Sequence, residues 1–508
     1  MLNVMTADEA IKLIKDGDTI AVNSFVGIEN PVELHEAIYR RYKSEGHPKH
    51  LTIISAAGFG TWSRDGNAES YIREGAMDKL ICGHFGAMMS TKELVLQDHF
   101  EAYNVPLGGI IHGLRAQAAG LPGALSKVGL GLFVDPREEG PAINEMSRGT
   151  ELSKSLAQVV ELDGEEFMYY KMPKVTVALI KASFCDRQGN VTLKDEYLKG
   201  DALTLAQAAK AHDGKVLVQV DHVTDEHIHP QLVDIPACLV DAVCMVKEEK
   251  KDPAFRAIAG NEAVAFDDLQ TKLDRLNELT STGKKTGAIG DIIGRRGAKE
   301  LKVGDIVNIG IGFPENVPRY ARDAGILDKI TLTVESGPVG GLPASGTVFG
   351  SMIGAGSVYA MAQQFDFYDG GGLDICYMGG LEVDRYGNVN CHRGPGAYSG
   401  VGGFSDITSN TKTVVFCVTF TTKGLKVSEQ DGVVAIDREG EISKFVDKVR
   451  SISFSGKRAV EKGQRVLYIT ERCVFTLTEK GMEILEVYPG IDRQRDIIDK
   501  LPEGFITE

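Results

Sequence analysis

The chain has 508 residues, with 56 Lys and Arg against 71 Asp and Glu, so its formal net charge at pH 7 is −15. Apolar residues make up 43% and charged residues 25%, a balance that is ordinary for a globular protein and excludes a chain too polar to form a core. The acidic excess disfavours binding to nucleic acid or to anionic lipid, because both depend on Lys and Arg that neutralise phosphate. We therefore expect neither nucleic acid nor a membrane as a partner.

Targeting and membrane-spanning segments are not expected either. Residues 1–18 carry acidic side chains among the apolar ones and lack the apolar core of a signal peptide. No apolar run approaches the roughly 20 residues that a bilayer-spanning helix needs. The eight cysteines are scattered without a Cys-x-x-Cys pair, and most lie in apolar runs such as 375–377 and 415–418. This pattern predicts buried, reduced thiols in a cytoplasmic enzyme.

Short β-rich runs alternate with helical patterns and glycine turns along the chain. In the first half, the runs lie at 18–22, 51–54, 175–180 and 215–220. The alternation predicts an α/β fold. The stretch 247–285 differs because it is charged and polar, with a helical pattern at 268–273. We interpret it as a connector between an N-terminal domain, 1–246, and a C-terminal domain, 286–508.

The two halves carry matching anchors in the same order. The anchors pair 15–20 with 302–307, 51–58 with 330–337, and 185–191 with 383–389. Three ordered matches predict two tandem α/β domains related by internal duplication. In the second pair, Glu335 stands where the first copy has Ala56. If the copies pack as pseudo-symmetric partners, the cleft between them carries a carboxylate on one side only, which favours a catalytic role; a surface turn is the alternative.

Glycine density rises after Glu335 in two clusters, at 337–372 and 394–403. Such loops bring backbone N–H groups close to a ligand and can stabilise phosphate or a developing oxyanion, although tight turns alone would also explain either cluster. An ionised glutamate is a weak nucleophile that suits an activated acyl group such as a thioester. The residues alone therefore predict acyl transfer through a glutamyl intermediate and do not identify the substrate.

Motifs for other chemistries are incomplete. Glu315 stands where a dinucleotide fingerprint would need its third glycine, and Glu278 occupies the first glycine position of a P-loop. His222, His227 and His229 lie in a polar loop without a cysteine pair, which favours solvated or capping histidines over a metal site. We expect no metal, no ATP and no nicotinamide cofactor.

The stretches 333–337 (Thr-Val-Glu-Ser-Gly) and 400–404 (Gly-Val-Gly-Gly-Phe) resemble the family I CoA-transferases, and the resemblance extends to 128–137, 365–374 and 468–473. Among them, the sequence is most similar to the single-chain propionate and acetate CoA-transferases. The resemblance implies two fused open α/β CoA-transferase domains. It also implies that CoA is a substrate rather than a permanently bound cofactor, and that the protein is a homo-oligomer, often a tetramer among relatives.

The resemblance further implies a ping-pong reaction on short carboxylic acids of the acetate or propionate type. Glu335 would attack an acyl-CoA and pass through a glutamyl–CoA thioester before the second acid accepts the CoA. The oxyanion hole would use the backbone N–H groups of Gly402 and Gly403, with a second donor in a Gln-Gly turn that reads Leu107-Gly108 here. If that donor is a main-chain group, the function survives with Leu107 in place of glutamine; if the side chain contacts the acyl group, Leu107 would make the pocket more apolar and change the choice of substrate.

Two alternatives stay open beside the transferase. An acyl-CoA hydrolase on the same scaffold would use water where the transferase uses a carboxylate, so a cosubstrate requirement distinguishes the two. A non-catalytic CoA or metabolite sensor would turn over no acyl-CoA, and the retention of Glu335 opposite Ala56 argues against it. The sequence leaves the donor and acceptor acids and the ligands of the CoA phosphates open.

Overall fold

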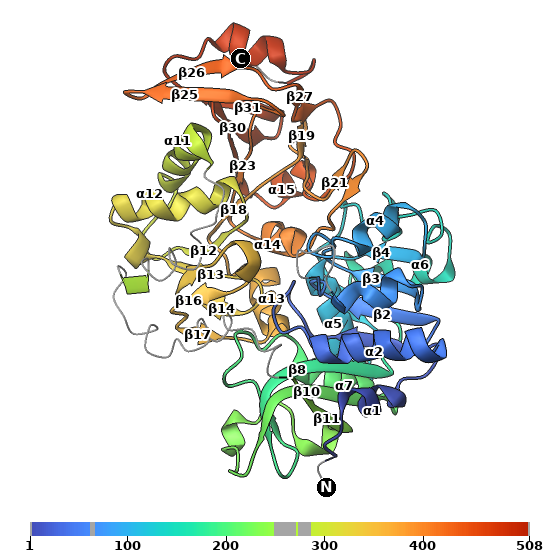
Figure 1. Ribbon diagram of the computed structural model, residues 1–508. Helices are drawn as coiled ribbons and strands as arrows, with labels where there is room; N and C mark the ends of the chain where they lie inside the picture. The colour runs from blue at the N-terminus through green and yellow to red at the C-terminus, as the bar shows by residue number, and fades with distance from the viewer. Residues whose placement is uncertain (1–2, 61–66, 248–270, 273–285, 506–508) are drawn as a thin grey trace.

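The computed structural model describes residues 3–60, 67–247, 271–272 and 286–505. Within them, the chain forms two α/β domains, each built around its own sheet (Figure 1). In that view the N-terminal domain, blue to green, occupies the right and the bottom, and the C-terminal domain, yellow to red, occupies the left and the top. Of the predicted connector, only 247 and 271–272 belong to the described residues.

The N-terminal sheet is parallel along its main path, in the order β11-β10-β8-β1-β2-β3-β4. Its central strands are buried on both faces, as their apolar runs require in a sheet covered by helices. The strands are β1 (Thr19–Val22), β2 (Leu51–Ser55), β3 (Met77–Cys82), β4 (Glu101–Asn104), β8 (Val177–Asp186), β10 (Lys215–Thr224) and β11 (Ala242–Met245), with β9 (Val191–Thr192) antiparallel to β8. The four β-rich runs expected in this half are thus confirmed as β1, β2, β8 and β10.

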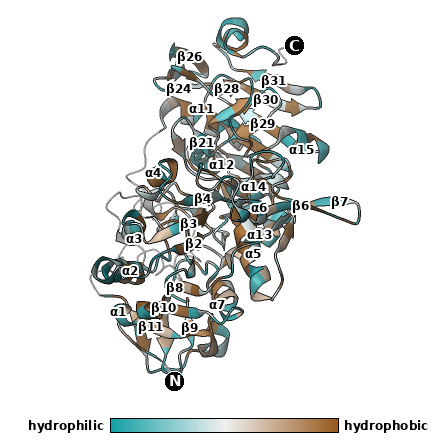
Figure 2. Cartoon of the chain, turned by 90° about the vertical axis from the view of Figure 1, so that its right-hand side faces the viewer, coloured by the Kyte–Doolittle hydropathy of each residue, from teal (hydrophilic) through white to brown (hydrophobic). Residues whose placement is uncertain are grey.

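The N-terminal domain contains seven α-helices within the described residues. They are α1 (Ala7–Ala10), α2 (Val32–Glu45), α3 (Ser70–Arg73), α4 (Thr91–Leu96), α5 (Leu107–Ala118), α6 (Glu151–Leu156) and α7 (Ala202–Lys210). A small antiparallel sheet of β5 (Ala124–Ser126), β6 (Ala157–Leu162) and β7 (Glu165–Tyr170) accompanies them, and its β6–β7 hairpin projects from the body of the molecule (Figure 2). Helix α5 follows β4 directly and lies at the boundary with the C-terminal domain (Figure 1).

The C-terminal sheet has a parallel centre and antiparallel edges, in the order β17-β14-β13-β12-β18-β23-β29-β30-β31. Its strands are β12 (Ile306–Ile309), β13 (Thr331–Thr333), β14 (Pro338–Val339), β17 (Ser357–Val358), β18 (Ile375–Met378), β23 (Thr413–Cys417), β29 (Arg465–Ile469), β30 (Cys473–Thr478) and β31 (Gly481–Val487). The helices are α11 (Gly287–Ala298), α12 (Val317–Asp323), α13 (Met361–Asp369), α14 (Phe404–Ser409) and α15 (Gly456–Glu461). Helices α13 and α14 face α5 across the domain boundary (Figure 1).

Short antiparallel pairs complete the C-terminal domain outside its main sheet. These are β15 (Leu342–Pro343) with β16 (Met352–Ile353), β19 (Glu382–Asp384) with β20 (Val389–Asn390), β21 (Arg393–Gly394) with β22 (Ala397–Tyr398), β24 (Thr421–Thr422) with β27 (Ile442–Ser443), and β25 (Lys426–Gln430) with β26 (Val433–Arg438). Strand β28 (Phe445–Val446) joins β19 in parallel. The β21–β22 hairpin forms the first part of the second glycine cluster, 394–403, and the loop 399–403 follows it.

Hydrogen bonds in one turn confirm the internal duplication. In the N-terminal domain, Asp186 Oδ1 accepts the backbone N–H of Asn190 at 3.0 Å, while the Asn190 amide donates to Asp186 Oδ2 at 3.1 Å. In the C-terminal domain, Asp384 and Asn388 form the same pair of bonds, each at 3.1 Å. The strands agree as well, because β1 lies between β2 and β8 as β12 lies between β13 and β18. The two domains are therefore copies of one architecture.

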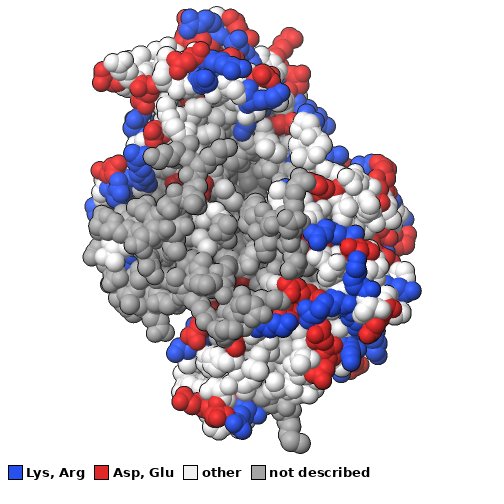
Figure 3. Space-filling model, viewed as in Figure 1, with Lys and Arg blue, Asp and Glu red and all other residues white. Residues whose placement is uncertain are grey.

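The distribution of charged side chains and the burial of the cysteines can be compared with what the composition predicts. Lys and Arg side chains are interspersed with Asp and Glu over the top and right of one face (Figure 3). Six of the eight cysteines are buried, as expected, whereas Cys391 is half-buried and Cys238 is exposed in the segment before β11. Over the described residues, no helix is long and apolar enough to cross a membrane.

Candidate active site

Glu335 lies just beyond the carboxyl end of β13, at the edge where ligands of parallel α/β sheets bind. Its position in the duplication is fixed by strand register. Thr331 N–H donates to the carbonyl of Asp305 as Thr52 N–H donates to that of Asp18. Four residues after the matched threonines stand Glu335 in one copy and Ala56 in the other.

A cavity of about 310 Å³ opens beside Glu335 at the domain boundary. Both domains line it. The N-terminal domain contributes Phe25, Val26, Ala57, His84 and Leu107, and the C-terminal domain contributes Asn308, Glu335, Phe349, Met378, Leu381, Phe404, Ile407 and the glycines of 400–403, among others. Among the described residues that line it, Glu335 is the only carboxylate and there is no Lys or Arg. The cleft thus carries its carboxylate on one side only.

Burial governs the electrostatics of Glu335. The residue is only 9% exposed, and burial raises the pKa of its carboxyl above the ordinary value, because removal of water disfavours the charged form. A side-chain hydrogen bond from Asn308 acts in the opposite direction and lowers this pKa. Asn308 is itself held, since its amide donates to the carbonyl of Thr333 and to the hydroxyl of Tyr368, both at 3.3 Å. A carboxylate with few hydrogen bonds from water is a stronger nucleophile than a solvated one.

The glycine loop that follows the β21–β22 hairpin is held by hydrogen bonds to the N-terminal domain. Val401 N–H donates to Asn104 Oδ1 at 3.1 Å, and Gly402 N–H donates to the carbonyl of Gly83 at 2.8 Å. The Gly402 carbonyl accepts the N–H of Leu107 at 3.0 Å. The two acceptors lie where parallel strands end, with Gly83 directly after β3 and Asn104 at the end of β4. The loop therefore belongs to one domain in sequence and to both in its hydrogen bonds.

These bonds orient one peptide group. Because a peptide is planar and trans, the Gly402 carbonyl and the Gly403 N–H point in opposite directions. With its carbonyl held by Leu107, this peptide directs the Gly403 N–H away from α5. A Cβ at Gly403 would lie 3.3 Å from Cγ of Glu335, so the two residues are in contact. Within the described part of the chain, the Gly403 N–H donates to no acceptor.

The amides expected to form an oxyanion hole thus have different partners. Gly402 N–H and Leu107 N–H are used in holding the loop. Gly108 N–H faces the carboxylate of Asp406, whose Oδ1 lies 2.3 Å from the place a Cβ on Gly108 would occupy. Leu107, Gly402 and Gly403 line the cavity with Glu335, whereas Gly108 does not. Of the four amides, Gly403 N–H is the one left to donate to a substrate.

Three further lining residues escaped the sequence analysis. Burial lowers the pKa of His84 to about 4, so its imidazole is neutral at physiological pH. Val26 has a φ of 57°, a left-handed conformation that β-branched residues rarely adopt and that concentrates at functional sites. Asn308 lies in the middle of β12. A polar residue inside an apolar strand was a usable signal for Asn308, whereas nothing in the sequence marks the backbone conformation of Val26.

Of the three histidines expected in a polar loop, His222 lies instead in β10, where it stacks on Phe184 with ring centroids 5.0 Å apart. His229 caps a short helical turn by accepting the N–H of Gln231 at 3.3 Å, as expected of a capping histidine. No group of three or more His, Cys, Asp or Glu side chains suited to a metal ion occurs among the described residues.

Comparison with known proteins decides the family. A model of the coenzyme A transferase family matches residues 4–245 and 292–495. The chain belongs to this family. The acetate CoA-transferase YdiF of Escherichia coli K12 is 38% identical over 504 residues, which cover 98% of this chain and 91% of the relative. The caffeate CoA-transferase of Acetobacterium woodii is 36% identical over 516 residues, covering 99% of this chain and 94% of the relative.

A solved structure agrees over the whole length. The acyl-CoA transferase YdiF of E. coli O157:H7, in a thioester complex with CoA, superposes with a TM-score of 0.87 at 35% identity, covering 100% of this chain and 95% of that chain. This coenzyme A transferase is therefore an enzyme with two tandem domains of the family fold, and CoA is its substrate. The two segments matched by the family model fall on the two domains, on either side of the predicted connector.

Proposed function

We propose that this coenzyme A transferase moves CoA from a short-chain acyl-CoA to a short monocarboxylic acid, with Glu335 as the nucleophile. The observation that carries the proposal is a buried carboxylate with a raised pKa that lies against Gly403, a residue whose N–H has no acceptor among the described residues, in a cavity between the domains. The name of the E. coli relative, an acetate CoA-transferase, supports acids of the acetate type.

The reaction runs in two matched halves. Glu335 Oε attacks the thioester carbon of the acyl-CoA, and the tetrahedral oxyanion accepts a hydrogen bond from Gly403 N–H. Collapse of this intermediate expels CoA thiolate and leaves an acyl-glutamyl anhydride. The thiolate then attacks the glutamyl carbonyl, which releases the first acid and forms a glutamyl–CoA thioester. The second carboxylate reverses these steps, leaves as the new acyl-CoA and restores the Glu335 carboxylate, so no thioester energy is lost.

The lining of the cavity supports uncharged acyl groups. The described lining residues provide no Lys or Arg to pair a second carboxylate, and a charge buried without a partner is strongly disfavoured. Leu107 and Met378 add apolar surface to the cavity that Glu335 lines. We therefore expect acetate, propionate and butyrate to be accepted and succinate to be rejected. Caffeate should be compared with these short acids as an acceptor, because a relative of similar identity is a caffeate CoA-transferase.

A trapping experiment tests the nucleophile. Borohydride reduces a glutamyl–CoA thioester to an alcohol, so incubation with acetyl-CoA and no acceptor, followed by reduction and peptide mapping, should place the modification on Glu335. Glu315→Gln is a matched control, since Glu315 is another carboxyl of the same domain whose pKa is raised, and it lies outside the cavity. Modification at another residue, or CoA exchange without any modification of Glu335, would refute the assignment.

An acceptor assay separates the transferase from the hydrolase. Release of free CoA from acetyl-CoA should remain slow in buffer, and formation of propionyl-CoA should depend on added propionate. Rapid hydrolysis without an acceptor would instead favour the hydrolase, and no turnover at all would favour a CoA sensor.

The remaining expectations concern organisation. We propose domain limits at 1–246 and 286–508 with a connector at 247–285, supported by the two matched segments of the family model. A cytoplasmic location is supported by eight free cysteines, most of them buried. A homo-oligomer, with a tetramer as the expected form, is tested by sedimentation velocity of the purified enzyme, and a monomer at all concentrations would contradict it.

A further inference from the structure

Asp406 is a buried carboxyl that the proposed reaction leaves unused. It lies in the first turn of α14, three residues after Gly403, and is 0% exposed. Neither carboxylate oxygen makes a hydrogen bond of ordinary geometry within the described residues. A carboxyl buried in this way costs several kcal/mol unless something compensates it, so its retention calls for a physical reason.

The group that faces Asp406 is the start of α5 in the other domain. Helix α5 has twelve residues, begins at Leu107 after Pro106, and has no side-chain cap of its own. Its first amide, Leu107 N–H, donates to the carbonyl of Gly402, and its second, Gly108 N–H, faces the Asp406 carboxylate. Helix starts expose free N–H groups and favour negative charge. The C-terminal domain therefore caps α5 through two groups, four residues apart, on either side of Gly403.

The absence of a side chain at Gly108 is required by this contact. A Cβ there would lie 2.3 Å from Asp406 Oδ1 and 3.3 Å from the ring of Phe365, and both distances are shorter than normal contacts. The ring of Phe365 is also 3.4 Å from the place of a Cβ on Gly403. The buried ring of Phe365 thus packs against both the helix start and the glycine loop.

We propose that Asp406 is a positioning residue for CoA transfer: by holding the start of α5 against the glycine loop, it keeps the Gly402–Gly403 peptide oriented with its N–H toward Glu335. The chain of contacts is Asp406 to Gly108 N–H, the adjoining Leu107 N–H to the Gly402 carbonyl, and that same peptide's N–H to the oxyanion. Without the first contact, the start of α5 can shift, which weakens the bond from Leu107 N–H to the Gly402 carbonyl that orients the donor. The inference rests on the proposed role of Glu335.

The charge on Asp406 matters as well as its shape. The titratable groups that act on it are Glu335, Asp369 from α13 and Tyr170 from β7. Burial raises the pKa of Asp406 to about 7, the Gly108 amide lowers it, and the Glu335 charge raises it further. Protonation near neutral pH weakens the attraction to the helix start. In the parent enzyme, kcat should therefore fall as pH decreases through about 7.

Substitutions on both sides of the boundary test the contact. Asp406→Ala should lower kcat about 100-fold, as expected for loss of one oxyanion donor, and leave KM for the acyl-CoA within about threefold. Asp406→Asn keeps an acceptor and should retain more activity. Gly108→Ala displaces the carboxylate from the other side and should resemble Asp406→Ala, and the double variant Gly108→Ala, Asp406→Ala should be no worse than either single one.

The pH profile supplies a readout that a merely structural role would not move. In Asp406→Asn the acidic limb of kcat should shift to lower pH, because both a titrating carboxyl and its repulsion of Glu335 are gone. The matched control is Asp366→Asn, which removes a charge that lies beside Arg115 and His112 across the same boundary without touching the glycine loop. It should leave kcat at pH 8 within about threefold of that of the parent.

Three results would overturn the inference: a kcat in Asp406→Ala within about threefold of the parent, additive effects of the two single substitutions, or an unmoved acidic limb in Asp406→Asn. If Asp406→Ala does not fold, Gly108→Ala and Asp406→Asn decide the question. The borohydride experiment on the parent keeps the two proposals apart. Labelling at Glu335 with unaffected Asp406 variants refutes only the positioning role, whereas absence of labelling refutes the nucleophile.

Discussion

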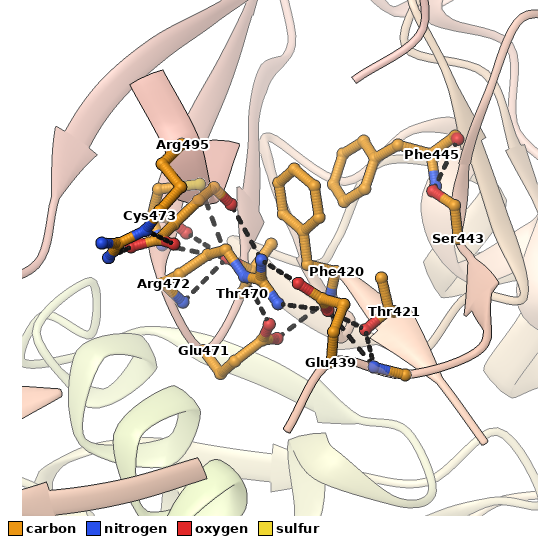
Figure 4. Close-up of polar contacts among 12 residues, drawn as sticks. Phe420, Thr421, Glu439, Ser443, Phe445, Thr470, Glu471, Arg472, Cys473 and Arg495 are labelled. Atoms are coloured by element: carbon orange, nitrogen blue, oxygen red, sulfur yellow. Dashed lines mark hydrogen bonds and ion pairs between the residues drawn. The ribbon is translucent and has the colours of Figure 1, made fainter. Parts of the chain in front are cut away.

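Two groups of buried charge in the C-terminal domain differ in whether their charges are paired. In the first, Arg472 and Glu471 are both fully buried and joined at 2.8 Å, and Arg472 also binds both oxygens of Glu439 at 3.0 and 3.1 Å (Figure 4). The guanidinium lies 4.5 Å from the ring centroid of Phe420, whose backbone N–H donates to Glu471. In this cluster, which we call the paired cluster, every charge has a partner.

The second group consists of Glu335, Asp406 and Asp369, which share one sign. Burial raises the pKa of each, and no cation within the described residues pairs with Glu335 or Asp406. The comparison shows which buried charges are compensated in the folded state and which are not. In the paired cluster the charges compensate one another, whereas the unpaired carboxyls of Glu335 and Asp406 are unfavourable for folding, as expected if they are retained for the catalytic roles proposed above.

The sharpest way to break this comparison is to remove the charge of the nucleophile. Glu335→Gln should lower kcat by at least about 10⁴-fold, because an amide oxygen does not form the glutamyl–CoA thioester. CoA exchange between acetyl-CoA and acetate measures the loss. The variant should remain folded, with a melting temperature no lower than that of the parent at pH 7. A folded variant with near-parental exchange would show that another residue is the nucleophile.

Breaking the paired cluster should act on stability instead. Arg472→Met leaves Glu471 buried without its partner and should cost about 3–5 kcal/mol in the free energy of unfolding. Urea unfolding, monitored by far-UV circular dichroism, measures this change in the free energy of unfolding. The combined variant Arg472→Met, Glu471→Gln should recover part of the loss. A destabilisation by Arg472→Met below about 1 kcal/mol would mean that the cluster is no more than a surface-like pair.

A smaller and local effect is expected at the oxyanion donor. In Gly403→Ala, the new Cβ would lie 3.3 Å from Cγ of Glu335 and 3.4 Å from Phe365, so one of them has to move. We expect kcat to fall about 10–100-fold while the free energy of unfolding changes by less than about 1 kcal/mol. Gly394→Ala is the control, since a Cβ there meets its nearest atom at an ordinary 3.7 Å. Equal losses in both variants would contradict the assignment.

The smallest effect, and the most direct measure of the unpaired charge, is in the pH dependence of stability. Because burial raises the pKa of Glu335, the folded state binds the proton more tightly than the unfolded state does. The stability that the protonated form contributes is present at low pH and is lost as pH rises through the raised pKa. Glu335→Gln should therefore melt at a higher temperature than the parent at pH 7, with the gap closing toward pH 4. A constant gap would indicate a packing effect.

Much of the fold could be predicted from the sequence because it follows from local patterns. Apolar runs became β1, β2, β8 and β10, and the repeated Asp-x-x-x-Asn turn revealed the duplication before any contact was known. Glu335 was found because the duplication supplied its own control in Ala56. These inferences need only the order of residues along the chain.

The rest of the site depends on contacts between distant segments, which no single stretch reveals. The Gly-Val-Gly-Gly-Phe run marked a glycine loop, but which amide stays free is decided by Gly83, Asn104 and Leu107 in the other domain. The turn at Leu107-Gly108 was expected to donate to the substrate; in the structure its two amides meet Gly402 and Asp406. His84 joins the cavity for the same reason, through its place after β3.

The hydrogen bonds from the N-terminal domain to residues 401 and 402 predict what happens when the two domains are produced as separate fragments. A chain cut within 247–285 would yield two fragments. The C-terminal fragment would contain Glu335 and the glycine loop, and the N-terminal fragment would contain the groups that orient the loop's oxyanion donor. Neither fragment alone would hold a working site, even if each folded perfectly. Mixing them should restore turnover in proportion to reassociation, so the enzyme could serve as a reporter in which activity records the meeting of two polypeptides.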